Sequence, residues 1–187
     1  GGIIVKRWLR QFLKLDARLS KAFLVGPEKT LISLILKVFA HSGDSWFWLI
    51  GLIIVWFFSN EEWQLRAGFL AVGLVLMAAA VIMIKFSIRR PRPDGEWGQI
   101  YRITDPHSFP SGHAARSAAL AVMGAFIGPP WFSLVLAIWA PWVGISRIAL
   151  GVHYLSDVLV GWIVGVLMGL LTLFLRPIAY QYLSLFL

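Results

Sequence analysis

The sequence predicts an all-α integral-membrane protein, a helical bundle of about five spans preceded by amphipathic interfacial helices. Of 187 residues, 59% are hydrophobic and 14% are charged, whereas soluble domains carry about 25% charged residues. Long apolar runs alternate with short polar turns, and 10 tryptophans are present, a residue type enriched at membrane interfaces. We interpret residues 1–187 as one domain, with interfacial or partly inserted helices at 1–40 and a transmembrane core at 45–176.

The first segment, residues 3–24, has the pattern of a basic amphipathic helix. Apolar side chains recur at steps of three and four residues: Ile4, Trp8, Phe12, Leu15, Leu19 and Phe23. Basic side chains lie between them: Arg7, Arg10, Lys14, Arg18 and Lys21. The pattern is typical of a helix in the interface plane that favours anionic head groups, and packing against the bundle is the alternative. Residues 28–40 predict a shorter, partly inserted helix.

Apolar segments predict the spans of the core. They are residues 45–58, 64–86, 113–126, 131–144 and 158–175. The polar segments 87–112 and 146–157 lie between some of these spans, and a long polar loop in a compact protein is usually functional. Because two spans separate the two polar segments, both emerge on the same face of the membrane and their residues can meet.

The segment 146–157 places an arginine, a histidine and an aspartate beside apolar runs. Titratable side chains at membrane depth are costly unless paired, which makes them functional candidates. His153 and Asp157 lie four residues apart. In a helix, the carboxylate would accept the Nδ1 proton and leave Nε2 free as a base or nucleophile. The alternative is a core histidine satisfied by a nearby acid.

Two earlier segments complete a set of three motifs. Residues 85–93 have the pattern K-x6-R-P through Lys85 and Arg92, and residues 110–113 read P-S-G-H. The third motif, S-R-x5-H-x3-D, includes Arg147, His153 and Asp157. In this order the motifs resemble those of the type-2 phosphatidic acid phosphatase superfamily. The resemblance is close over residues 85–157 and general in the flanking helices.

The resemblance implies a lipid phosphatase that forms a phosphohistidine. His153 would attack phosphorus, Asp157 would hold its tautomer, and His113 would protonate the leaving oxygen and later activate water. The implied phosphate-binding residues are Lys85, Arg92, Ser111, Gly112 and Arg147. Cations and backbone donors at a helix N-terminus suit a phosphate group. The implied substrate is a phosphate monoester or diphosphate of a membrane lipid, such as phosphatidate, phosphatidylglycerophosphate or a polyprenyl diphosphate.

Two other functions remain open. Vanadium-dependent haloperoxidases share these motifs, and a basic cluster could serve an anion transporter. The apolar spans and the short chain argue against the first, and paired histidines with an aspartate exceed what anion binding needs. The chain has no cysteine, which excludes disulfides and thiolate chemistry.

The expected partners are a membrane lipid substrate and the bilayer, with no nucleic acid, and the oligomeric state is left open. We expect no metal and no cofactor, because a cation-rich cluster repels a divalent ion. Arg89, Arg90 and Arg102 are interpreted as head-group anchors or as a solvated loop face, and direct substrate contact is the alternative. The polar cluster at His41 and Asp44 is interpreted as the start of a helix that is capped by Ser42 or Asp44.

Basic residues also indicate orientation. Of 17 Lys and Arg residues, 8 lie in residues 1–37 and 6 in residues 85–116. The positive-inside rule makes the face that carries these residues cytoplasmic. Phosphate binding explains part of the charge near the motifs, but it does not explain the N-terminal residues. We predict a multi-pass cell-membrane protein whose N-terminus and site share the cytoplasmic side.

Overall fold

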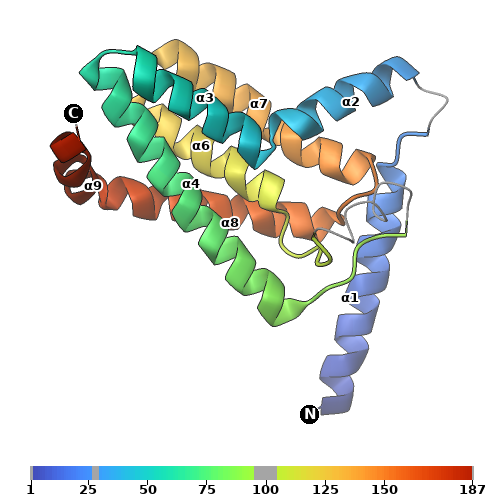
Figure 1. The fold of residues 1–187 in the computed structure, drawn as a ribbon. Coiled ribbons are helices and arrows are strands. Elements are labelled where there is room, and N and C mark those ends of the chain that lie inside the picture. Colours follow the sequence, from blue (N-terminus) through green and yellow to red (C-terminus); the bar gives the residue numbers. More distant parts are fainter. Residues whose placement is uncertain (1, 27–29, 95–104, 187) are drawn as a thin grey trace.

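A computed structural model of the chain, drawn in Figure 1, describes residues 2–26, 30–94 and 105–186. Its helices are α1 (Gly2–Ala22), α2 (Thr30–Ser42), α3 (Ser45–Phe58), α4 (Glu61–Ile88), α6 (Gly112–Ile127), α7 (Pro130–Ala149), α8 (Leu155–Phe174) and α9 (Arg176–Leu183), with a 3-10 turn at Ser184–Phe186. Within these residues, β pairing is limited to an isolated bridge between Pro91 and His107. The predicted all-α class is confirmed.

The helices of the core lie where the apolar segments predicted them. By length and composition, α4, α7 and α8 can each cross a membrane, and α2 with α3 forms a pair bent by 57° that can act as one broken span. α6 has 16 residues, about 24 Å of helix against a hydrocarbon core of about 30 Å. The described residues therefore give three or four candidate spans rather than about five, because α3 and α6 are short.

α6 is the central helix of the bundle and packs against α8, α7 and α4. Its close contact with α8 depends on Gly161, Gly165 and Gly169. A Cβ on Gly165 would lie 2.1 Å from the carbonyl oxygen of Ala115, and one on Gly161 would lie 2.6 Å from the carbonyl oxygen of Ser111. Small residues allow membrane helices to approach closely. The start of α6 is therefore held directly against α8.

The ends of the helices bring the motifs together. α4 ends at Arg89, which has a left-handed φ of 53°. Ser111 caps α6 by accepting from the N–H of Ala114 at 3.4 Å. Gly151 turns the chain from α7 into α8 with a φ of 69°, a conformation that glycine adopts without a Cβ clash. The described parts of the polar loops after α4 and after α7 meet at one end of the bundle, as predicted (Figure 1).

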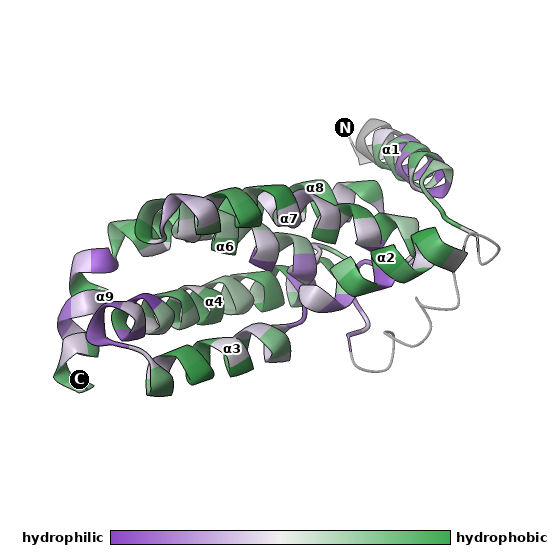
Figure 2. Ribbon diagram, turned by 90° about the horizontal axis from the view of Figure 1, so that it is seen from above, coloured by the Kyte–Doolittle hydropathy of each residue, from purple (hydrophilic) through white to green (hydrophobic). Residues whose placement is uncertain are grey.

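α1 lies beside this end, contacts the start of α8 and extends away from the bundle (Figures 1 and 2). The side chains that it buries are polar, Asp16 and Ser20. Its large apolar side chains are exposed: Trp8, Phe12, Leu15, Leu19 and Phe23. Hydrophobic residues also line the bundle helices in Figure 2. Among the described side chains, α1 therefore contacts the protein through polar residues and leaves its apolar face uncovered.

Candidate active site

The predicted site residues come from the ends of four helices. In chain order they are Lys85 (α4), Arg92 (the following loop), Ser111, Gly112 and His113 (the start of α6), Arg147 (the last turn of α7), His153 (the turn after α7) and Asp157 (the first turn of α8). Six side chains are buried: Lys85, Arg92, Ser111, Arg147, His153 and Asp157. Buried cations are costly unless anions accompany them.

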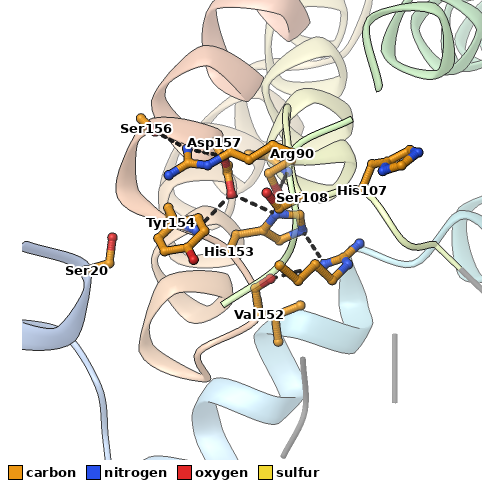
Figure 3. Close-up of polar contacts among 12 residues, drawn as sticks. Ser20, Arg90, His107, Ser108, Val152, His153, Tyr154, Ser156 and Asp157 are labelled. Atoms are coloured by element: carbon orange, nitrogen blue, oxygen red, sulfur yellow. Dashed lines mark hydrogen bonds and ion pairs between the residues drawn. The ribbon is translucent and has the colours of Figure 1, made fainter. Parts of the chain in front are cut away.

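His153 is held with Nε2 as a hydrogen-bond acceptor. Nη1 of Arg92 lies 3.2 Å from this nitrogen and 3.1 Å from the carbonyl oxygen of Val152, in the cluster drawn in Figure 3. Because arginine can only donate, the contact assigns the imidazole proton to Nδ1. Burial lowers the pKa of His153 well below its usual 6.5, and the charges of Arg92 and Arg147 lower it further. The ring is therefore neutral, with a lone pair on Nε2.

The pairing of His153 with Asp157 differs from the predicted helical pair. α8 begins at Leu155, so His153 precedes the helix. Its Nδ1 lies 3.6 Å from Oδ2 of Asp157, which is beyond hydrogen-bond distance. The reason is that both carboxylate oxygens have nearer partners. Oδ1 accepts from Nη1 of Arg90 at 2.8 Å, and Oδ2 accepts from the N–H of Tyr154 at 2.9 Å.

Asp105 lies among the cations of the site and was missed by the sequence analysis. Its carboxylate accepts from Nζ of Lys85 and, at 2.8 Å, from Nη2 of Arg92. Burial raises the pKa of Asp105, but the hydrogen bond and charge of Lys85, followed by the charge of Arg92, outweigh burial and hold this pKa below 3.8. An ionised carboxylate thus neutralises two residues that were predicted to bind phosphate. No motif marks this residue.

His113 pairs with Asp44, which lies at the break between α2 and α3. Nε2 of His113 is 2.7 Å from Oδ1 of Asp44, and Nδ1 of His41 is 3.1 Å from Oδ2. The prediction that Asp44 caps a helix is wrong: its side chain makes no capping hydrogen bond to α3, because the carboxylate is engaged by the two histidines. Arg116 fixes the same break by donating to the carbonyl oxygen of Gly43.

Arg147 and Ser111 connect the third motif to the second. The charge of Arg147 is within electrostatic range of both His113 and His153, and its carbonyl oxygen accepts from the N–H of His153 at 3.1 Å. The N–H of Ser111 donates to the carbonyl oxygen of Asp157 at 2.9 Å. The three motifs are therefore joined at one place.

Gly112 follows Ser111 at the start of α6. A Cβ built on this residue would meet Val81 Cγ1 at 3.7 Å and no other atom of the described residues within 4 Å. Packing within the described part of the protein does not require a glycine at this position. A requirement for glycine here would come from a ligand that approaches the backbone.

Arg90 was interpreted as a head-group anchor, and the structure corrects this. Its side chain is 12% exposed and bridges two carboxylates, with Nη2 2.6 Å from Asp16 and Nη1 2.8 Å from Asp157. Its guanidinium group also stacks 4.0 Å above the ring centre of Tyr154. Arg89 is exposed, as an anchor would be. Arg102 lies outside the described residues.

A cavity of about 350 Å³ opens at His153. One wall is the turn between α7 and α8, and another is the end of α1 with the residues that follow it, which supply Ala17, Ser20, Lys21 and Leu24. A more apolar cavity of about 230 Å³ lies elsewhere, beside Trp48 of α3, and contains no motif residue. The cavity at His153 therefore adjoins the reactive groups.

Comparison with known proteins gives a family match and several relatives. The model of the PAP2 superfamily matches residues 66–179. A lipid A 1-phosphatase from Porphyromonas gingivalis is 37% identical over 121 residues, which are 60% of this chain and 25% of that protein. A decaprenylphosphoryl-5-phosphoribose phosphatase from Mycobacterium tuberculosis is 38% identical over 112 residues, 59% of each chain. The chain thus spans a quarter and about three-fifths of the lengths of these relatives.

A solved structure has the same fold. The transmembrane PAP2 type phosphatidylglycerolphosphate phosphatase from Bacillus subtilis matches with a TM-score of 0.70 at 26% identity, covering 87% of this chain and 84% of that chain. Together with the apolar helices, this similarity identifies a multi-pass membrane protein.

Proposed function

The chain belongs to the PAP2 superfamily, and from this premise we propose that it hydrolyses a phosphate monoester or diphosphate of a membrane lipid through a phosphohistidine intermediate. The observation that carries the proposal is a neutral, buried His153 whose Nε2 accepts from Arg92. Lys85 and Arg147 are buried in the same cluster. The charges of these two side chains can stabilise the negative charge on the phosphoryl group in the transition state.

In the first step, Nη1 of Arg92 moves its hydrogen bond from Nε2 of His153 to a phosphate oxygen, the freed Nε2 attacks phosphorus, and the bond from phosphorus to the lipid oxygen breaks. Nδ1 keeps its proton, and Asp157, with its Oδ2 3.6 Å from Nδ1, stabilises the positive charge that develops on the ring. His113 gives a proton to the leaving oxygen. Burial and the charge of Arg147 disfavour the protonated form of His113, whereas the carboxylate of Asp44, 2.7 Å away, and the negative charge of the bound phosphate favour it before this transfer.

In the second step, water attacks phosphorus and the bond from phosphorus to Nε2 breaks. His113, which lost its proton in the first step, accepts one from the attacking water. Inorganic phosphate leaves, and both histidines return to their starting protonation states.

The placement of the protein in the membrane is the second part of the proposal. α1 lies in the interface, since its exposed face is apolar and is flanked by five basic residues. Such a helix is attracted to anionic lipid. The basic N-terminus and the site share one side, which is the cytoplasmic side by the positive-inside rule.

The test is phosphate release by the purified protein in lipid-containing detergent micelles. The substrates are phosphatidate, phosphatidylglycerophosphate, a polyprenyl diphosphate and a lipid A analogue with a 1-phosphate. We expect hydrolysis of at least one in the presence of EDTA, with competitive inhibition by vanadate, which mimics five-coordinate phosphorus. His153→Ala should abolish turnover, whereas Arg176→Gln, on α9, should not. Vanadate-dependent halide oxidation without phosphate release would contradict the proposal.

A further inference from the structure

The N-terminus of α8, which carries Asp157, is capped from another helix. The preceding residue, Tyr154, makes no side-chain capping hydrogen bond. Oγ of Ser20 accepts from the N–H of Leu155 at 2.8 Å, and Oδ1 of Asp16 accepts from the N–H of Ser156 at 3.0 Å. First-turn N–H groups have no partner within their own helix. Residues of α1 therefore supply the acceptors that α8 lacks.

Asp16 makes further contacts beyond capping. Its Oδ2 accepts from Nη2 of Arg90 at 2.6 Å and from the hydroxyl of Ser156 at 2.5 Å. Asp16 is 4% exposed. A buried carboxylate with charged and neutral donors on both oxygens is fixed in position, and it fixes its partners in turn.

Arg90, which Asp16 holds in position, in turn holds the carboxylate of Asp157. Nη1 of Arg90 donates to Oδ1 of Asp157 at 2.8 Å and to Oγ of Ser156 at 2.7 Å. Figure 3 shows Arg90, Ser156 and Asp157 in one group beside His153. With Oδ1 held by Arg90 and Oδ2 held by Tyr154, the carboxylate of Asp157 cannot rotate freely. Its orientation toward His153 thus depends on a residue of α1.

We propose that Asp16 is a positioning residue for the phosphatase reaction: from the interfacial helix α1 it holds Arg90 against Asp157 and so fixes the carboxylate that faces His153. This inference rests on the proposed function. It makes α1 a part of the active site, both as the support of Asp157 and as a wall of the cavity at His153. Asp16 lies outside the three motifs, and Arg90 and Ser156 occupy unspecified positions within them.

The first test compares kinetic constants of variants. Asp16→Asn keeps the size of the side chain and removes its charge. Because Asp16 does not contact the reacting atoms, we expect kcat to fall by roughly 10- to 100-fold with KM changed by less than about threefold. Asp16→Glu should recover part of kcat. Glu62→Gln is the matched control, since it also removes a carboxylate paired with an arginine, Arg66, at the other end of the bundle, and it should leave kcat unchanged.

A double-mutant cycle tests whether Asp16 acts through Arg90. If it does, Asp16→Asn together with Arg90→Gln should lower kcat no further than Arg90→Gln alone. Independent effects that multiply would overturn the proposal, and so would a wild-type kcat in Asp16→Asn. Should Asp16→Asn fail to fold, Arg90→Lys tests the same link. Its single ammonium group cannot bridge both carboxylates as the guanidinium fork does, so kcat should again fall.

Hydrogen exchange separates this inference from the proposed function. In Asp16→Ala, which removes both carboxylate oxygens, we expect the amides of the first turn of α8 to exchange faster, while those at the start of α4 keep their protection. Unchanged exchange in α8 would refute the capping by Asp16. This measurement needs no substrate. If the wild-type protein released no phosphate from any lipid in the panel, the proposed function would fail. Faster exchange in the variant would still show that α1 caps α8.

Discussion

Burial of His153 has a consequence for stability as well as for reactivity. Its folded-state pKa lies well below 6.5. At a pH between the folded-state pKa and 6.5, His153 binds a proton in the unfolded chain but not in the folded protein. The free energy of unfolding therefore falls as the pH drops through 6.5. We expect the melting temperature in detergent to decrease between about pH 7.5 and about pH 5.5. The decrease in melting temperature should be smaller in His153→Gln. An equal decrease in the variant and the wild-type protein would contradict a buried, neutral His153.

A substitution at Gly112 tests whether the phosphate group binds close to the backbone at the start of α6. A Cβ there meets a protein atom only at an ordinary contact distance, 3.7 Å, among the described residues. Gly112→Ala should therefore fold with a nearly unchanged melting temperature. If a phosphate oxygen binds the backbone N–H at this position, the added methyl group should raise the inhibition constant of vanadate roughly tenfold. Gly51→Ala, in the lipid-facing helix α3, is the control and should change neither value.

The proposed role of His113 as a general acid, assisted by Asp44, can be tested by changing the leaving group of the substrate. Asp44→Asn removes the charge that stabilises protonated His113 and should slow cleavage of a natural lipid phosphate by about 100-fold. An analogue with a p-nitrophenol leaving group needs no proton. Its burst of nitrophenolate should be nearly as fast in the variant as in the wild-type protein. A burst slowed as much as the natural reaction would argue against His113 as the acid.

At the scale of the helices, the close contact between α6 and α8 fixes the distance between the site residues of these two helices. A Leu side chain at position 165 would clash with the backbone of Ala115, because a Cβ alone comes within 2.1 Å of its carbonyl oxygen. We expect Gly165→Leu to destabilise the protein by about 3 kcal/mol and to separate Ser111 from Asp157. Gly51→Leu is the matched control, since a Cβ at residue 51 meets nothing within 4 Å. Thermal melting in detergent compares the two variants.

The core helices were predictable because apolar runs and their breaks are local signals, and the motif residues were predictable from their spacing. Partners that lie far apart in the chain were not. Arg90 and Asp16 are separated by 74 residues, and nothing in the pattern of α1 shows what its aspartate contacts. The four-residue spacing of His153 and Asp157 predicted a helical pair, but the carboxylate accepts from Arg90 and from the N–H of Tyr154 instead. Tertiary contacts decided these cases.

The orientation of the whole molecule is tested by labelling. The chain has no cysteine, so single cysteines can be introduced. Ala22→Cys lies at the end of α1 on the side of the site, and Glu61→Cys lies at the opposite end of α4. With the site facing the cytoplasm, a membrane-impermeant thiol reagent should label residue 61 in intact cells and residue 22 only after permeabilisation. The reverse pattern would place the site outside and leave the chemistry unchanged.

One face of α1 is apolar and exposed, and another face lines the cavity at His153, so under the proposed function the substrate arrives at this cavity from the membrane. A lipid phosphate reaches such a site by lateral diffusion within one leaflet rather than from bulk water. The quantity that sets the rate is then the mole fraction of that lipid in the bilayer. Adding a neutral lipid at constant total substrate dilutes the substrate in two dimensions and slows the reaction, even though its concentration per volume has not changed.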